Sequence, residues 1–334
     1  MTSPDVAPTI LDAARRLTAE SVISVTPANA GANSRLFRVD TAAGPRALKS
    51  YPTRPGDRRR RADIEMQALT FLRARGLTAA PQPLRHDPQG QFLLMEWIDG
   101  KTAGAHTEGD TTDAAEFIAQ VFALSAHPDA AALPLASEAC LSAATIVEQI
   151  ESRLAQFSPE SEVSGWMDSA FLPLLARTRQ SVAAELAGPT LLAPGQRRLI
   201  PADFGFHNAI RQPDGRLRYI DFDYFGWDDP VKLAADIYLH PAMNLTPADV
   251  ATFFRAMRRA LPDDDDFPAR LNRHLPLYAV RWALIVLNVF RGDRLQELPP
   301  AGAARTALRD ARIQTAQTLL AKGQHFDVKN FSLD

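Results

Sequence analysis

Residues 201–208 read PADFGFHN, and residues 219–223, a short polar stretch later, read YIDFD. In these two segments Asp203 is followed five positions later by Asn208, and the second segment carries Asp221. The turn signal Pro-Asp-Gly between them predicts a β-hairpin whose second strand ends at Asp221. Because a hairpin is a stiff connection, this spacing predicts that Asn208 and Asp221 lie close together.

These three side chains have the chemistry that phosphoryl transfer requires. One carboxylate has to accept or orient the proton of the attacking hydroxyl, and we assign Asp203 this catalytic role. An amide oxygen and a second carboxylate, from Asn208 and Asp221, suit Mg²⁺, which prefers oxygen ligands and carries the charge of nucleotide phosphates. The layout is typical of phosphotransfer enzymes of the protein-kinase type. Asp223 is a candidate for a further metal ligand, and a turn cap is its open alternative.

The triplet Asp-Phe-Gly at 203–205 has a second interpretation, because the same letters mark the metal-binding aspartate of protein kinases. Under that interpretation an Asp and an Asn five residues apart should lie upstream, but residues 180–196 contain neither type. We therefore take Asp203 as the catalytic-loop aspartate. His207 has no HxxxH or cysteine partner in the sequence, which favours an ordinary loop or core histidine over a functional one.

The first hundred residues are expected to form a small sheet with one helix. Four segments have the short, bounded pattern of strands: 22–25, 35–40, 46–51 and 92–98. The apolar spacing in residues 63–75 predicts a helix, and Gly76 is a plausible C-cap for it.

Lys49 is the candidate cation for the donor phosphates. Only five of the 37 basic residues are lysines, and this one stands in the middle of the third predicted strand. A strand lysine at this point is typical of kinases, where a glutamate on the following helix holds it against the phosphates. Glu65 is the expected partner, with Asp63 as the second choice.

Two further segments of this region are candidates for nucleotide contacts. Residues 29–34 read NAGANS, and the small residues Gly31, Asn33 and Ser34 would let backbone N–H groups approach phosphate oxygens, although a plain hairpin loop has the same composition. Residues 95–98 read MEWI and end the predicted sheet, so the backbone of Glu96 and Ile98 would face an adenine edge.

From about residue 105 the sequence is mainly helical around the hairpin. The expected helices are 112–126, 137–157, 168–188, 231–240, 247–260, 268–290 and 300–322. The predicted fold class is therefore α+β, with a small antiparallel N-terminal sheet and a larger helical part that carries the β-hairpin. The predicted boundary gives an N-terminal nucleotide-binding lobe, 1–98, and a C-terminal catalytic and acceptor-binding lobe, 99–334.

Composition excludes several classes of protein. The 334-residue chain has 37 basic and 39 acidic residues, a net charge of −2, which argues against a nucleic-acid binder. One cysteine, Cys140, excludes a disulfide framework and a multi-cysteine metal site. The most apolar run, 282–290, is shorter than the roughly 20 residues of a membrane span. With no signal-peptide pattern at the start, we expect a cytoplasmic protein without membrane or obligate protein partners.

The order of these motifs resembles the aminoglycoside phosphotransferase and choline kinase family of small-molecule kinases over roughly residues 20–290. The resemblance implies a bilobal protein-kinase-like fold, ATP (GTP in some members) with Mg²⁺, and phosphorylation of a hydroxyl on a small molecule. By motif match it implies that Asp203 is the catalytic base, that Asn208 and Asp221 bind the metal, and that Lys49 clamps the phosphates.

The sequence departs from the family pattern at three points. Pro201 stands where the family usually has a histidine that braces the catalytic loop, His207 stands where a small residue is common, and Leu233 stands where members often have an aspartate. The first departure leaves open a pseudokinase that binds nucleotide as a regulatory module. Metal-assisted phosphoester hydrolysis is a second alternative, which a requirement for ATP as co-substrate would distinguish from the kinase.

The acceptor is expected to be a small molecule rather than a protein. Protein kinases insert a long activation segment after the metal aspartate, whereas here Asp221 is followed within ten residues by Asp-Asp-Pro and a predicted helix. An aminoglycoside, a sugar or a choline-like alcohol would each fit. Two charge runs, at 58–61 and 263–266, are expected to be solvated.

Overall fold

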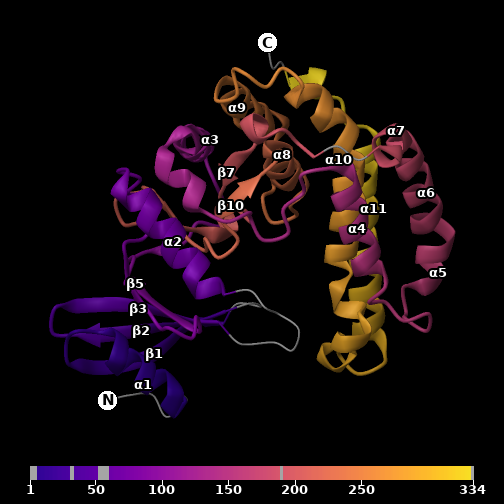
Figure 1. The fold of residues 1–334 in the computed structure, drawn as a ribbon. Helices are drawn as coiled ribbons and strands as arrows, with labels where there is room; N and C mark the ends of the chain where they lie inside the picture. The colour runs from indigo at the N-terminus through magenta and orange to yellow at the C-terminus, as the bar shows by residue number, and fades with distance from the viewer. Residues whose placement is uncertain (1–5, 31–33, 52–59, 189–190, 332–334) are drawn as a thin grey trace. The chain divides into compact units, whose positions relative to one another are not determined.

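The computed structural model describes residues 6–30, 34–51, 60–188 and 191–331 (Figure 1). By its internal contacts the chain divides into two compact units. The first consists of Met1–Asp110, Ala123–Ser137 and Leu199–Trp227; the second consists of Thr111–Phe122, Glu138–Arg198 and Asp228–Asp334. The first unit therefore holds both the N-terminal sheet and the predicted catalytic hairpin, and the predicted lobe boundary at residue 98 stays a prediction.

Within the described part of the first unit, five strands form an antiparallel sheet in the order β1-β2-β3-β5-β4. They are β1 (Val22–Ala30), β2 (Arg35–Thr41), β3 (Gly44–Ser50), β4 (Pro83–His86) and β5 (Phe92–Glu96). Lys49 on β3 lies opposite Leu36 on β2 and Leu93 on β5. The predicted strand lysine is therefore held in a central strand, where neighbours on both sides fix its position.

The two faces of this sheet have different partners because side chains alternate along a strand. Leu48 is buried in an apolar cluster with Ile10, Ala13 and other residues of helix α1 (Pro8–Leu17). Lys49, the next residue, points to the opposite face and contacts helix α2 (Arg61–Ala74). The apolar core on one face thus supports the charged site on the other.

Helix α2 ends as the sequence predicts. Gly76 has a left-handed backbone (φ 83°), and the Leu77 N–H donates to the carbonyl of Leu72 at 3.1 Å, which satisfies one of the last helix carbonyls. The helix starts at Arg61, two residues earlier than expected, so it includes one more basic residue in its first turn.

The predicted hairpin is present in the first unit. Strands β8 (Ala209–Arg211) and β9 (Leu217–Tyr219) pair antiparallel, and β6 (Lys101–Thr102) joins them at the β8 edge. Two further short strands, β7 (Arg198–Ile200) and β10 (Gly226–Asp228), pair with each other. The hairpin therefore carries Asn208 just before its first strand and Asp221 just after its second.

Gly100 fixes the approach of the chain to this hairpin. Its φ is 149°, and a Cβ there would lie 2.3 Å from the carbonyl oxygen of Arg211. We expect Gly100→Ala to lower the free energy of unfolding by about 3 kcal/mol through clash and backbone strain. Gly215→Ala is the matched control, since Gly215 has φ 89° but open space around its Cβ, and should cost about 1 kcal/mol. Urea unfolding measures both, and equal losses would contradict the clash.

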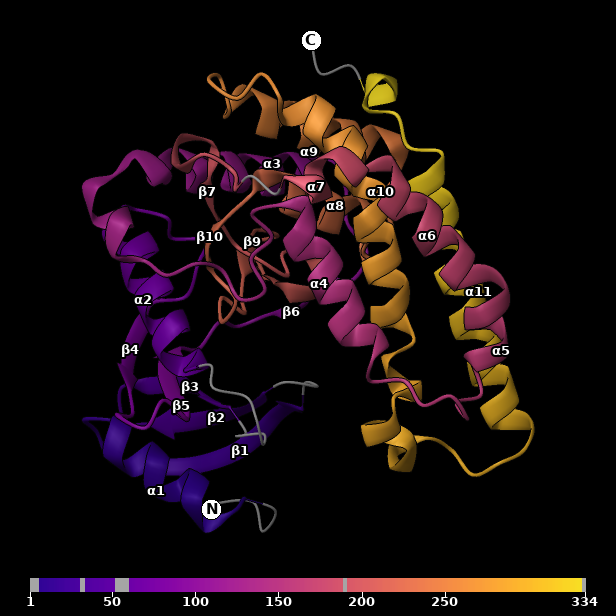
Figure 2. The ribbon, with the colours of Figure 1, turned by 45° about the vertical axis from the view of Figure 1, so that its right-hand side comes forward.

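The second unit is helical. The α-helices of the rest of the chain are α3 (Glu108–Ala123), α4 (Ala143–Leu154), α5 (Ser164–Trp166), α6 (Leu172–Ser181), α7 (Ala183–Ala187), α8 (Pro230–Leu239), α9 (Pro247–Arg259), α10 (Phe267–Val286) and α11 (Ala303–Gln324). Helices α4, α10 and α11 lie side by side (Figure 2). Gly323 allows a close approach of α10 and α11, because a Cβ there would lie 2.4 Å from that of Ala279. No helix in the described ranges is long and apolar enough to span a membrane.

These elements confirm the predicted α+β fold class, with corrections to three of the expected helices. The segment 168–188 is not one helix, because α6 ends at Ser181 and α7 begins at Ala183. Helix α3 begins at Glu108 rather than near residue 112, because Thr107 and Asp110 exchange hydrogen bonds across its first turn. Helix α4 begins after Ser142 rather than Ser137, because the Ser142 hydroxyl accepts the Thr145 N–H at 3.1 Å. Both capping pairs lie in polar stretches where several residues could have been the N-cap, so the sequence does not show which one is used.

Among the described residues of the two charge runs, the expectation of solvation is wrong for Arg61 and Asp264, and residues 58–59 lie outside the described residues. In the second unit Asp264 is buried and accepts a 2.7 Å hydrogen bond from Arg270. In the first unit Arg61 is also buried, at the start of α2. A buried charge needs an opposite charge nearby, and sequence composition alone does not show where that partner lies.

Candidate functional site

A buried lysine with two carboxylates forms the centre of the site. The Lys49 Nζ lies 2.6 Å from Glu65 Oε2 and 2.7 Å from Asp221 Oδ1. Glu65 is fully buried and Lys49 nearly so, whereas the Asp221 side chain is 31% exposed. The three residues are supplied by β3, α2 and the segment after β9, so the structure brings together residues 172 positions apart.

Glu65 is held by two more donors. The Tyr51 hydroxyl donates to Glu65 Oε2, and the backbone N–H of Phe222 donates to Glu65 Oε1 at 3.1 Å. Both oxygens of this buried carboxylate are therefore satisfied. Since Phe222 follows Asp221, Glu65 connects α2 to the backbone of the predicted metal-binding segment as well as to Lys49.

The charges of this centre shift the pKa values of its members. Burial by itself lowers the pKa of Lys49, but the negative charges of Asp221 and Glu65 outweigh it and raise the pKa well above its usual value. Burial by itself raises the pKa of Asp221, but the positive charge of Lys49 outweighs burial and lowers this pKa below its usual value. The lysine is thus a fixed cation at neutral pH, and Asp221 is ionised beside it.

Asp223 lies in the same buried environment. Its side chain is 4% exposed, and its Oδ2 lies 3.6 Å from the guanidinium of Arg61. Burial raises the pKa of Asp223 well above its usual value; Lys49 opposes this shift, whereas the charges of Asp221 and Glu65 add to it. Three carboxylates, of Glu65, Asp221 and Asp223, share two cations, Lys49 and Arg61, so the neutral form of Asp223 is favoured until a further cation binds.

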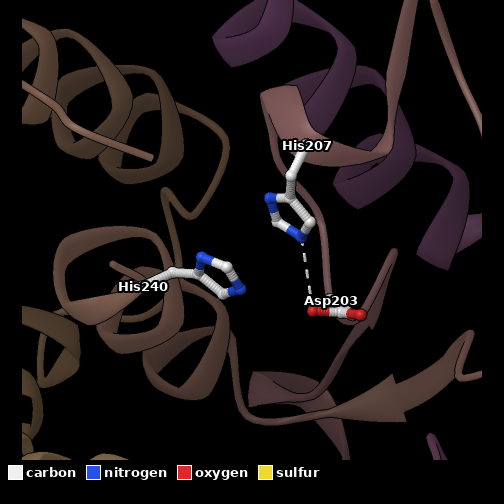
Figure 3. A group of neighbouring side chains, drawn as sticks. All are labelled: Asp203, His207 and His240. Atoms are coloured by element: carbon white, nitrogen blue, oxygen red, sulfur yellow. Dashed lines mark ion pairs between the residues drawn. The ribbon is translucent and has the colours of Figure 1, made fainter. Parts of the chain in front are cut away.

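Asp203 and Asn208 lie together at the start of the hairpin. The Asn208 Nδ2 donates to the backbone carbonyl of Asp203 at 2.9 Å. His207 Nε2 lies 3.5 Å from Asp203 Oδ1, and the two side chains face each other (Figure 3). The Asp203 side chain is 47% exposed, so it is accessible to a substrate. The sequence favoured an ordinary loop or core histidine at position 207 and did not predict that His207 lies beside the Asp203 carboxylate.

Both candidate aspartates have an uncommon backbone conformation. Asp203 has φ 60° and Asp221 has φ 70°, in the left-handed region that L-residues other than Asn and Asp seldom adopt. Among the described non-glycine residues only Glu138 and Asn244 also have positive φ. Strained residues of this kind concentrate at functional sites, and the short aspartate side chain is one that tolerates the conformation.

A cavity in the first unit is lined by residues of the candidate site and by residues of the sheet. Its polar lining includes Lys49, Glu65, His207, Asn208 and Asp221, and its apolar lining includes Leu36, Ala47, Met95, Ile98, Ile210 and Ile220. Ser34, Glu96 and Trp97 also line it. The predicted residues Gly31 and Asn33 lie outside the described residues. Charged groups beside an apolar slot suit a ligand that has both phosphates and a flat base.

Glu96 has a role that the sequence did not indicate. Its carboxylate accepts two hydrogen bonds from Arg218 of β9, at 2.8 and 3.2 Å, and one from the Gln82 N–H at 2.9 Å. Arg218 holds the pKa of Glu96 below its usual value despite partial burial. The Glu96 N–H itself donates to the Gln82 carbonyl, so this N–H is not available to a ligand. No local pattern could have paired Glu96 with a residue 122 positions away.

The donor set near Asp221 fits a hard divalent cation. Asn208 uses its amide nitrogen on Asp203, which leaves the amide oxygen as a ligand atom. Asp221 places Oδ1 on Lys49 and shares a side-chain hydrogen bond with Asp223. Asn208 and Asp221 line the same cavity, and an amide oxygen with carboxylate oxygens is the chemistry that Mg²⁺ prefers.

The chain belongs to the phosphotransferase enzyme family (APH), whose model matches residues 24–267. This confirms the predicted family and the prediction of an enzyme. No curated protein matches the sequence.

Several solved structures have a similar fold. Spectinomycin phosphotransferase APH(9)-Ia, in complex with ADP and spectinomycin, has a TM-score of 0.64 at 12% identity and covers 98% of this chain and 100% of its own. Choline kinase LicA from Streptococcus pneumoniae has a TM-score of 0.58 at 17% identity and covers 90% and 94%. ADP-bound aminoglycoside phosphotransferase APH(2'')-Ib has a TM-score of 0.59 at 15% identity and covers 98% and 99%. At these identities the likeness shows the fold, which is the predicted protein-kinase-like one.

Proposed function

We propose that this enzyme transfers the γ-phosphate of ATP, with Mg²⁺, to a hydroxyl of a small molecule. The observation that carries the proposal is the arrangement of Lys49, Glu65 and Asp221 at 2.6–2.7 Å, on a cavity that Asn208 also lines and beside which Asp203 is exposed. Phosphoryl transfer depends on such positioned charges more than on covalent chemistry.

Each residue has a separate task in this proposal. Asp203 accepts a hydrogen bond from the acceptor hydroxyl and takes its proton as the oxygen attacks phosphorus in line. Lys49, fixed by Glu65, holds the donor phosphates. Asn208, Asp221 and Asp223 would hold Mg²⁺, which when bound supplies positive charge to the phosphate oxygens.

The nucleotide base would occupy the apolar part of the cavity. Leu36 and Ala47 line it from the sheet and Ile210 lines it from the hairpin. The carbonyl of Glu96 and the N–H of Ile98 are the backbone groups that would recognise the edge of adenine. Arg218 of the hairpin donates a hydrogen bond to the Glu96 carboxylate, which would keep this side chain away from the ligand. GTP is the alternative nucleotide, which the same backbone groups would contact differently.

The acceptor is proposed to be a hydroxylated small molecule. Strand β10 begins at Gly226, five residues after Asp221, which leaves no room for the long segment that protein kinases use to bind peptide. Structures of similar fold include enzymes named for spectinomycin, other aminoglycosides and choline. The catalytic loop is held by Asn208 on Asp203, although Pro201 replaces a histidine, so we favour an active kinase over a pseudokinase.

Nucleotide binding tests this proposal before the acceptor is known. We expect ADP with MgCl₂ to raise Tm by several degrees more than ADP with EDTA, because the stabilisation of the folded state grows with the logarithm of ligand concentration over Kd. ATP consumption across a panel of aminoglycosides, sugars and amino alcohols then identifies the acceptor. If neither ADP nor GDP shifts Tm with Mg²⁺, the proposal is wrong; if ATP is hydrolysed equally with and without every acceptor, the enzyme is a hydrolase.

A further inference from the structure

Arg61 is a buried cation that the proposed reaction does not use. It is the first residue of α2, and its guanidinium lies 3.6 Å from the carboxylate of Asp223, with side chains only 7% and 4% exposed. The same guanidinium lies over the ring of Tyr224, 5.6 Å from the ring centre. Arg61 thus contacts two consecutive residues of the segment that follows Asp221.

The surroundings of the Arg61–Asp223 pair indicate a role beyond packing of the chain. A guanidinium is planar and always charged, so it can hold a carboxylate on one side and stack on an aromatic ring. Asp223 has Asp221 two residues before it and Glu65 in its electrostatic environment, so it sits in a surplus of negative charge. Arg61 is the cation placed on the Asp223 side, as Lys49 is placed on the Asp221 side.

Helix α2 therefore contacts the metal-binding segment at two points. Glu65 accepts the Phe222 N–H at 3.1 Å, and Arg61, one turn earlier on the same helix face, pairs with Asp223. These two contacts, four residues apart on a rigid helix, fix where residues 222–223 lie along α2 and how they are oriented toward it. The contact of Lys49 with Asp221 holds the residue before them, and Arg61 adds the contact at Asp223.

We propose that Arg61 is a positioning residue that holds Asp223 in place to bind the divalent cation beside the nucleotide. The inference rests on the proposed function, because it assigns Asp223 to the metal site. Arg61 itself touches neither nucleotide nor acceptor in this account. Partners that orient a metal ligand from behind usually change metal affinity about 10- to 100-fold when they are removed.

The test measures Mn²⁺ binding to the protein at saturating ADP. The electron paramagnetic resonance signal of free Mn²⁺ reports how much of the ion is unbound. We expect Arg61→Met to weaken Mn²⁺ binding at least about tenfold. ADP affinity in EDTA should change less than twofold, and Arg61→Lys should recover part of the loss. Arg60→Met is the matched control, because Arg60 is the preceding residue, 58% exposed and paired with Asp63, and it should bind Mn²⁺ like the wild type.

A double-mutant cycle separates positioning from a general effect on folding. If Arg61 acts through Asp223, adding Arg61→Met to Asp223→Asn should weaken Mn²⁺ binding less than twofold further. Additive losses, or wild-type affinity in Arg61→Met, would overturn the inference. Should Arg61→Met not fold, Arg61→Lys alone and in the Asp223→Asn background gives the same comparison. Absence of Mn²⁺ binding in the wild type with ADP would instead contradict the proposed function.

Discussion

Asp203→Asn is expected to lower kcat at least about 1000-fold, the upper part of the range for a lost proton acceptor. The amide keeps the shape of the side chain but cannot take the proton of the acceptor hydroxyl. Asparagine tolerates the left-handed backbone of this position (φ 60°), so the loop should keep its conformation. Steady-state kinetics with the identified acceptor measures the loss, and calorimetry measures ADP affinity.

The controls make this result specific to chemistry. ADP affinity with Mg²⁺ should stay within about threefold of the wild-type value, because Asp203 accepts the hydroxyl proton and does not hold the nucleotide. Asp214→Asn, in the exposed turn of the same hairpin, should have wild-type kcat. A variant at Asp203 that retained more than a tenth of kcat would remove this residue from the catalytic role.

Lys49→Met is expected to lower kcat/KM for ATP at least about 100-fold, as expected when one charged donor to a developing phosphate charge is lost. The methionine keeps the length of the side chain but leaves Glu65 and Asp221 without the cation between them. Because Glu65 is fully buried, Tm should also fall, and Tyr51 and the Phe222 N–H would remain as its donors.

Lys329→Met is the matched control for this second prediction, since Lys329 is exposed near the C-terminus. It should show wild-type kinetics and Tm. If Lys49→Met used ATP as well as the wild type at a temperature where it is folded, Lys49 would be a structural residue only.

The geometry of the candidate site was predictable where it depends on short sequence patterns. Asp203, Asn208 and Asp221 have a fixed spacing around a turn, and the hairpin is where that spacing places it. Lys49 and Glu65 follow from a strand and the next helix, and their 2.6 Å contact is as expected. The turn and the helix cap at Gly76 depend on backbone preferences of one or two residues, which a sequence shows directly.

Contacts between distant segments were not predictable. Arg61 belongs to a basic run that favours solvent, and its burial depends on Asp223, 162 positions later in the sequence. Arg218 and Glu96 pair for the same kind of reason, and each is an ordinary charged residue in its own strand. His207 lies beside Asp203 because a short 3₁₀ turn, Phe206–Asn208, brings it back toward the start of the loop. Such pairings follow from packing rather than from periodicity.

The transfer itself can be followed by ³¹P NMR with ATP, Mg²⁺ and the acceptor, for the wild type and Asp203→Asn in parallel. The account predicts a new phosphomonoester resonance in the wild-type sample, equal in amount to the ADP formed, and no such resonance in the variant. Release of ADP with inorganic phosphate alone in the wild type, or the same phosphomonoester yield from both proteins, would contradict it.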